Sequence, residues 1–180
     1  MAQGLRDHLL NWYETVFDLI DMRSFSNLWY WIGLAVIWSG ASHWVIGVPY
    51  DLVLRARRQG GDTENDLNDL VRVNVNRILY IADTSGIWLL AISCFLLTTL
   101  ALLGFVYGLE FGQALFLLAF PMTLVFALSI HTARGIMTAD GNGLQKRLSR
   151  HRFITQAIGM VSIFITALWG MWHNMTFLPI

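Results

Sequence analysis

The fold of this chain is decided by residues 85–107, which read SGIWLLAISCFLLTTLALLGFVY. The stretch contains no Asp, Glu, Lys or Arg, and as an α-helix it would be about 35 Å long. The hydrocarbon core of a bilayer is about 30 Å thick, and lipid cannot satisfy the backbone N–H and C=O groups of an open chain. A charge-free stretch of this length therefore predicts a membrane-spanning helix.

Three more stretches are also apolar and free of Asp, Glu, Lys and Arg. Gly108 and Gly112 flank a short turn after residues 85–107, so the second and third stretches should form an antiparallel hairpin. Pro49 should end the first stretch because its ring removes a backbone donor. The sequence thus predicts an all-α, integral membrane four-helix bundle. Its spans would be residues 28–48, 85–107, 111–130 and 153–172.

Composition agrees with a membrane protein and limits the functional classes. Of the 180 residues, 56% are hydrophobic, and the mean hydropathy is +0.53. The formal net charge is zero, so no basic field exists to attract nucleic acid. The one cysteine, Cys94, lies inside an apolar run, which excludes an internal disulfide and argues against a cysteine-ligated metal centre.

Basic residues set the predicted orientation. Connections that carry an excess of Lys and Arg stay in the cytoplasm, and this applies to residues 49–84 and 131–152. Both termini should then be extracytoplasmic, on the side that keeps Arg6, Arg23 and Glu110. The basic residues of the two connections are Arg55, Arg57, Arg58, Arg72, Arg77, Arg134, Lys146, Arg147, Arg150 and Arg152.

Two helices are expected outside the spans. Residues 1–24 alternate apolar and acidic positions at helical spacing, which predicts an amphipathic helix lying along the outer membrane interface or docking on a partner. After Gly60 and Gly61, an apolar stripe predicts a cytoplasmic helical extension that runs into the second span. The stripe consists of Leu67, Leu70, Val71 and Ile78.

Histidines are the candidate cofactor ligands. His43 and His131 end two spans on the same predicted side, and His151 begins a third. Imidazoles facing each other across a bundle can ligate haem or a transition metal, although a hydrogen-bonding role at the interface explains the same placement. Nucleophile elbows, P-loops, zinc-protease helices and dinucleotide fingerprints do not occur in the sequence, which argues against an enzyme.

Asp83 and Pro121 are the candidate residues for ion passage or gating. Asp83 lies at the cytoplasmic end of the second span, where a carboxylate can serve an ion or proton path or simply an interfacial contact. Pro121 should free a backbone carbonyl inside the third span, which makes either a bend or a hinge. Gly104 and Gly108 lie four residues apart and predict close helix packing.

The sequence also resembles a known family. The segments concerned are MRSFSNLW at 22–29, SHW at 42–44, VPYD at 48–51 and VNVNRILYIAD at 73–83. They are similar to small four-span proteobacterial inner-membrane proteins of unknown function, some of which are labelled as components of the Suf iron–sulfur assembly complex. The resemblance implies a bacterial inner membrane with periplasmic termini, and it implies no catalytic residue.

Three functional hypotheses follow. The first is a non-enzymatic accessory or scaffold subunit that packs against itself or a larger membrane complex, with the lipid bilayer as its surroundings. The second is a homo-oligomeric channel or small-solute pore with Asp83 and Pro121 at the ion path. The third is a haem or metal protein that uses His43 and His131.

Overall fold

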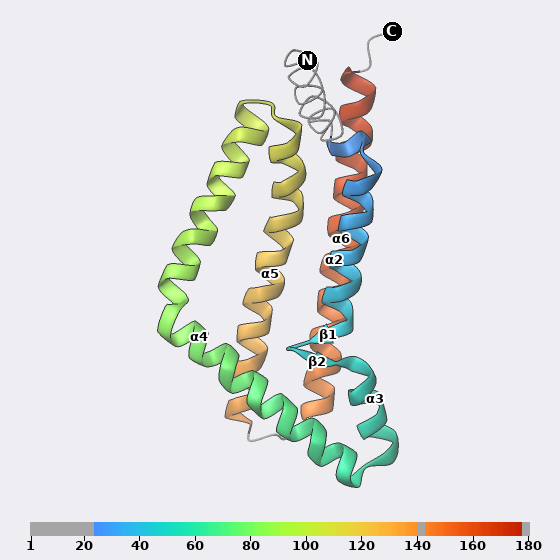
Figure 1. The fold of residues 1–180 in the computed structure, drawn as a ribbon, viewed down its shortest axis with the longest axis vertical. Coiled ribbons are helices and arrows are strands. Elements are labelled where there is room, and N and C mark those ends of the chain that lie inside the picture. The colour runs from blue at the N-terminus through green and yellow to red at the C-terminus, as the bar shows by residue number, and fades with distance from the viewer. Residues whose placement is uncertain (1–23, 140–142, 178–180) are drawn as a thin grey trace, which may run out of the picture.

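A computed structural model of the chain describes residues 24–139 and 143–177, and the predicted all-α class is confirmed (Figure 1). The predicted amphipathic helix over residues 1–24 lies outside this part, except for Ser24. The elements in chain order are the 3-10 helix η1 (Ser24–Ser26), α2 (Leu28–His43), β1 (Trp44–Val45), β2 (Val48–Pro49), α3 (Tyr50–Gln59), α4 (Gly61–Ala101), the π-helix η2 (Leu102–Val106), α5 (Glu110–Thr138) and α6 (Leu144–Phe177).

The long helices run side by side between two ends of the molecule (Figure 1). We call the end that carries β1, β2 and α3 the cap end. The opposite end carries η1, the turn between η2 and α5, and the last residues of α6, and we call it the turn end. Segments from distant parts of the sequence therefore meet at both ends.

Among residues 24–139 and 143–177, three helical segments are long and apolar enough to cross a membrane. They are Gly61–Val106, Glu110–Thr138 and Leu144–Met175. They contain the predicted spans 85–107, 111–130 and 153–172, apart from Tyr107. The membrane character of the chain is thereby supported. α2 has 16 residues, which gives it a length of about 24 Å, somewhat less than the hydrocarbon thickness.

The predicted end of the first apolar stretch is wrong. The helix stops at His43, and residues 44–49 form a two-stranded antiparallel hairpin in place of a helix that reaches residue 48. Ile46 and Gly47 both have positive φ, 53° and 74°, which is the geometry of a two-residue hairpin turn. Hydropathy cannot reveal this turn, because residues 44–48 are as apolar as the helix before them.

α4 confirms the predicted helical extension, because one helix runs from Gly61 to Ala101 without interruption. It bends along its length, so that its first half crosses the cap end and its second half rises beside α5 (Figure 1). α5 and α6 also continue past the predicted spans toward the cap end, to Thr138 and from Leu144. The two connections, 49–84 and 131–152, are thus largely helical.

The main hydrophobic core lies at the cap end. It joins the hairpin, α3, the first half of α4, the end of α5 and the start of α6. Apolar side chains that are removed from water stabilise this part of the fold, and most of them lie outside the four apolar stretches. The buried residues are Val45, Ile46, Val48, Val53, Ala56, Leu67, Val71, Val75, Leu79, Ala133, Ile136, Leu144 and Leu148.

Candidate functional site

The second half of α4 has one partly covered face. α5 is the helix that α4 contacts most extensively, and the partly covered residues recur at helical spacing. The rest of this half-helix is open, as the exposed fractions of Ile87 (85%) and Trp88 (72%) illustrate. Among residues 24–139 and 143–177, α5 is therefore the main neighbour of this segment. The partly covered residues are Ala82, Ser85, Gly86, Leu89, Ser93 and Leu97, with Thr99, Leu100 and Ala101 in the last turn.

A second row of residues runs along the open side of the same segment. Thr84, Ile87, Ala91, Cys94 and Thr98 are all exposed, and they recur at alternating intervals of three and four residues. This is the heptad spacing by which one helix meets another along a seam. Four of the five side chains are small, which allows close approach of helix backbones in a bilayer. We call these five residues the α4 open row.

At the turn end, two glycines bring η2 and α5 into backbone contact. A Cβ atom added to Gly104 would lie 2.6 Å from the backbone nitrogen of Gln113, and one added to Gly112 would lie 2.9 Å from the nitrogen of Gly104. The close approach predicted at Gly104 is confirmed. Gly108 serves the turn itself, where its φ is +71°.

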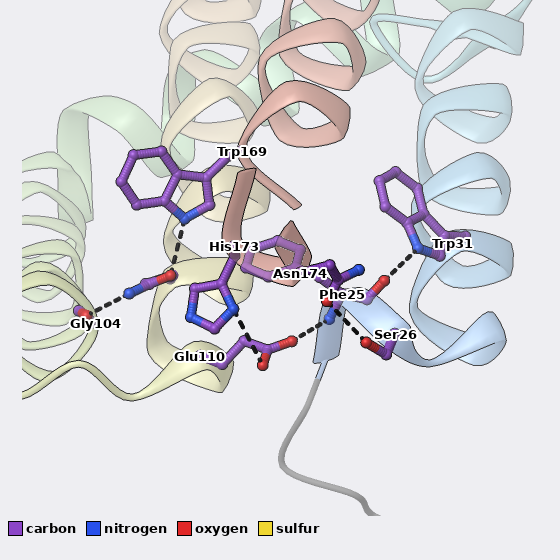
Figure 2. Close-up of polar contacts among 9 residues, drawn as sticks. Phe25, Ser26, Trp31, Gly104, Glu110, Trp169, His173 and Asn174 are labelled. Carbon is purple, nitrogen blue, oxygen red and sulfur yellow. Dashed lines mark hydrogen bonds and ion pairs between the residues drawn. The ribbon is translucent and has the colours of Figure 1, made fainter. Parts of the chain in front are cut away.

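Gln113 ties three elements together at this contact (Figure 2). Its Nε2 donates to the carbonyl of Gly104 at 2.8 Å, and its Oε1 accepts from Trp169 Nε1 at 2.8 Å. The side chain is buried, so both bonds are made away from water, where an unpaired amide group would be costly. Gln113 thereby fixes α5 to η2 and α6.

Glu110 makes a second connection at the turn end. Its exposed fraction is 9%, and its Oε1 accepts from the backbone N–H of Phe25 at 2.5 Å. The Nδ1 atom of His173 lies 3.7 Å from Oε2 (Figure 2). A buried carboxylate needs such partners. Glu110 therefore joins η1 to the start of α5 and the end of α6.

His43 and His131, the two candidate haem or metal ligands, have different surroundings. His43 is exposed, and its ring lies edge-on to Trp44 with 5.8 Å between centroids. His131 lines a pocket between α5 and α6 together with His151, and His43 is not among its lining residues. Among residues 24–139 and 143–177, no three His, Cys, Asp or Glu side chains gather closely enough to hold a metal ion.

Asp83 lies against α5. Its Oδ1 accepts from Arg134 at 3.4 Å, and both side chains are largely exposed. An exposed ion pair of this kind adds little stability in water. Its clearest effect is to join the middle of α4 to the cap-end part of α5.

Pro121 is buried inside α5, and the carbonyl it should free has a partner on another helix. A proline nitrogen cannot donate to the carbonyl four residues earlier, which belongs to Leu117. The hydroxyl of Ser162 on α6 donates to that carbonyl at 3.4 Å. The Leu117 carbonyl, which has no donor within its own helix, therefore joins α5 to α6.

Taken together, the described residues form two kinds of arrangement, the bonded cluster at the turn end and the α4 open row. No family model, curated protein or solved structure matches this chain. Function therefore has to be inferred from these residues.

Sequence reasoning alone missed both arrangements. Glu110 and Phe25 are 85 residues apart in the chain, and Gln113 and Trp169 are 56 apart, so no local pattern connects them. The α4 open row did leave a signal, because small residues at heptad spacing are visible within residues 84–98. The uniform hydrophobicity of the surrounding stretch conceals it.

Proposed function

We propose that this protein is a non-enzymatic subunit of a bacterial inner membrane that crosses the bilayer four times and pairs with a second copy of itself through the α4 open row. Its role would be that of an accessory or scaffold component. The observation that carries the proposal is the exposure of this heptad-spaced row of mostly small residues on a segment whose main contact, within residues 24–139 and 143–177, is α5.

Four crossings are supported by the arrangement of the helices. α2, the second half of α4, α5 and α6 run alternately away from and toward the turn end (Figure 1). With α2 in the bilayer, all ten Lys and Arg residues of the two predicted connections lie toward the cap end. The cap end would then face the cytoplasm, because basic connections remain on that side.

A protein partner suits the α4 open row better than lipid does. Lipid tails are as apolar as leucine, so helices in a bilayer associate mainly through close packing and hydrogen bonds. Ala91, Cys94 and Thr98 leave a shallow strip along which a second backbone can approach. Two copies related by a twofold axis would present the same strip to each other.

The single natural cysteine tests this pairing directly. Cys94 is exposed and belongs to the α4 open row. A disulfide forms only between Cα atoms about 4.4–6.8 Å apart, so oxidation reports close contact. Treatment of native membranes with molecular iodine, which enters lipid, should convert most of the unaltered protein into a covalent dimer on a non-reducing gel.

The matched control places the only cysteine on another exposed helix face at similar depth. In Cys94→Ser protein, Val161→Cys on α6 should give little dimer, because Val161 lies outside the α4 open row. Equal dimer formation by the two proteins, or loss of the Cys94 dimer on mild dilution with added lipid, would reject the pairing.

A further inference from the structure

A pocket of about 340 Å³ lies between the cap-end parts of α5 and α6. Its wall combines basic and apolar side chains. Arg147 and Arg150 lie near the start of α6, whereas Leu128 and Ile154 lie at least one helical turn closer to the turn end. The pocket is therefore basic toward the cap end and apolar toward the apolar stretches. The remaining lining residues are His131, Thr132, Gly135 and His151.

The basic part of the pocket has no acidic counterpart among the residues that line it. Within residues 24–139 and 143–177, neither Arg147 nor Arg150 forms an ion pair. Guanidinium groups bind the oxygens of a phosphate through short charge-assisted hydrogen bonds. The pocket thus carries two cations that are available to an anion.

Gly135 leaves the space that the guanidinium group of Arg147 occupies. A Cβ atom added to Gly135 would lie 3.0 Å from a terminal nitrogen of Arg147. The guanidinium therefore lies on the surface of α5, in space that any side chain at residue 135 would fill. This contact directs the charge into the groove between the two helices.

His151 forms a fixed part of the wall, since it is only 4% exposed. The hydroxyl of Thr132 donates its proton to the carbonyl of Leu128 at 2.8 Å. The 3.1 Å contact between Thr132 Oγ1 and His151 Nδ1 must then be donated by the imidazole. The ring is held in one orientation, so the pocket has a defined polar wall.

We propose that this pocket binds the phosphodiester headgroup of an anionic phospholipid, with Arg147 and Arg150 on the phosphate and the acyl chains along Leu128 and Ile154. A free phosphate ion would use the same guanidinium groups, but it would gain nothing from the apolar wall. The pocket also lies where α5 and α6 leave their predicted spans, at residues 130 and 153, which is the depth of lipid headgroups. The site does not depend on pairing through the α4 open row.

Native mass spectrometry of the delipidated, detergent-purified chain tests the site with three probes, phosphatidylglycerol, phosphatidylcholine and inorganic phosphate. The unaltered protein should retain phosphatidylglycerol preferentially. The double variant Arg147→Gln, Arg150→Gln should bind it about tenfold more weakly, because it loses charge-assisted bonds. Arg57→Gln, Arg58→Gln on α3 is the matched control with the same change of charge, and it should shift binding less than about twofold.

A second variant keeps the charge and changes only the geometry. Gly135→Ala should displace the guanidinium of Arg147 and weaken phosphatidylglycerol binding, while its thermal unfolding temperature stays at or above that of the unaltered protein. Equal loss in the α3 control would mean that binding follows net charge alone. Equal retention of phosphatidylcholine, or binding of inorganic phosphate as tight as that of the lipid, would also overturn the proposal.

Discussion

Replacing Leu67 with alanine is expected to lower the free energy of unfolding by about 2–5 kcal/mol. Leu67 lies on the first half of α4, its exposed fraction is 0%, and it belongs to the core at the cap end. Removing its side chain loses buried apolar contacts and leaves a cavity in this core. Titration of the detergent-solubilised protein with sodium dodecyl sulfate, followed by tryptophan fluorescence, measures the change.

Leu70→Ala provides the matched control for this experiment. Leu70 lies on the same helix and loses the same atoms, but its exposed fraction is 37%, so less apolar surface returns to solvent. Its expected cost is less than half that of Leu67→Ala. Similar costs for the two variants would show that the cap end is not packed as described.

The second large effect is expected at Gly104. Alanine there would place its Cβ 2.6 Å from the backbone nitrogen of Gln113, and backbone cannot rotate away as a side chain can. η2 and α5 would have to separate, which also strains the bonds of Gln113. Gly104→Ala should therefore destabilise the fold by about 1–3 kcal/mol, measured by the same titration.

Gly86→Ala is its control and should act in the opposite direction. Gly86 lies in α4, which continues directly into η2, and no atom lies within 4 Å of a Cβ added to it. Glycine in a helix costs about 0.5–1 kcal/mol relative to alanine, so this variant should be more stable by roughly that amount. Destabilisation by both changes would mean that crowding at Gly104 is not the cause.

Much of the fold could be predicted because it depends on local patterns. The absence of charge over residues 85–107 and the apolar stripe that begins at Leu67 together predict one long helix, and α4 is that helix. The end of α2 could not be predicted in the same way. Its hydropathy continues past His43, and only the backbone at Ile46 and Gly47 turns the chain.

The candidate sites were less predictable because they depend on which helix faces which. Gly104 was visible as a packing residue, but its partner Gly112 was visible only as a residue beside the turn. Glu110 and Gln113 gain their roles from η1 and α6, which are remote in the sequence. His131 and His151 line the same pocket. The pairing of His43 with His131 as cofactor ligands remains a prediction from depth alone.

The central claim is that four helices cross the bilayer with the cap end in the cytoplasm, and single-cysteine labelling tests it most directly. In Cys94→Ser protein, cysteines would replace Leu28 and Tyr107 at the turn end and Asn65 at the cap end, all of them exposed positions. A membrane-impermeant maleimide applied to cells with a permeabilised outer membrane should label Leu28→Cys and Tyr107→Cys. It should label Asn65→Cys only after the inner membrane is opened. Labelling of Asn65→Cys from outside, or protection of Leu28→Cys while Tyr107→Cys is labelled, would contradict the account.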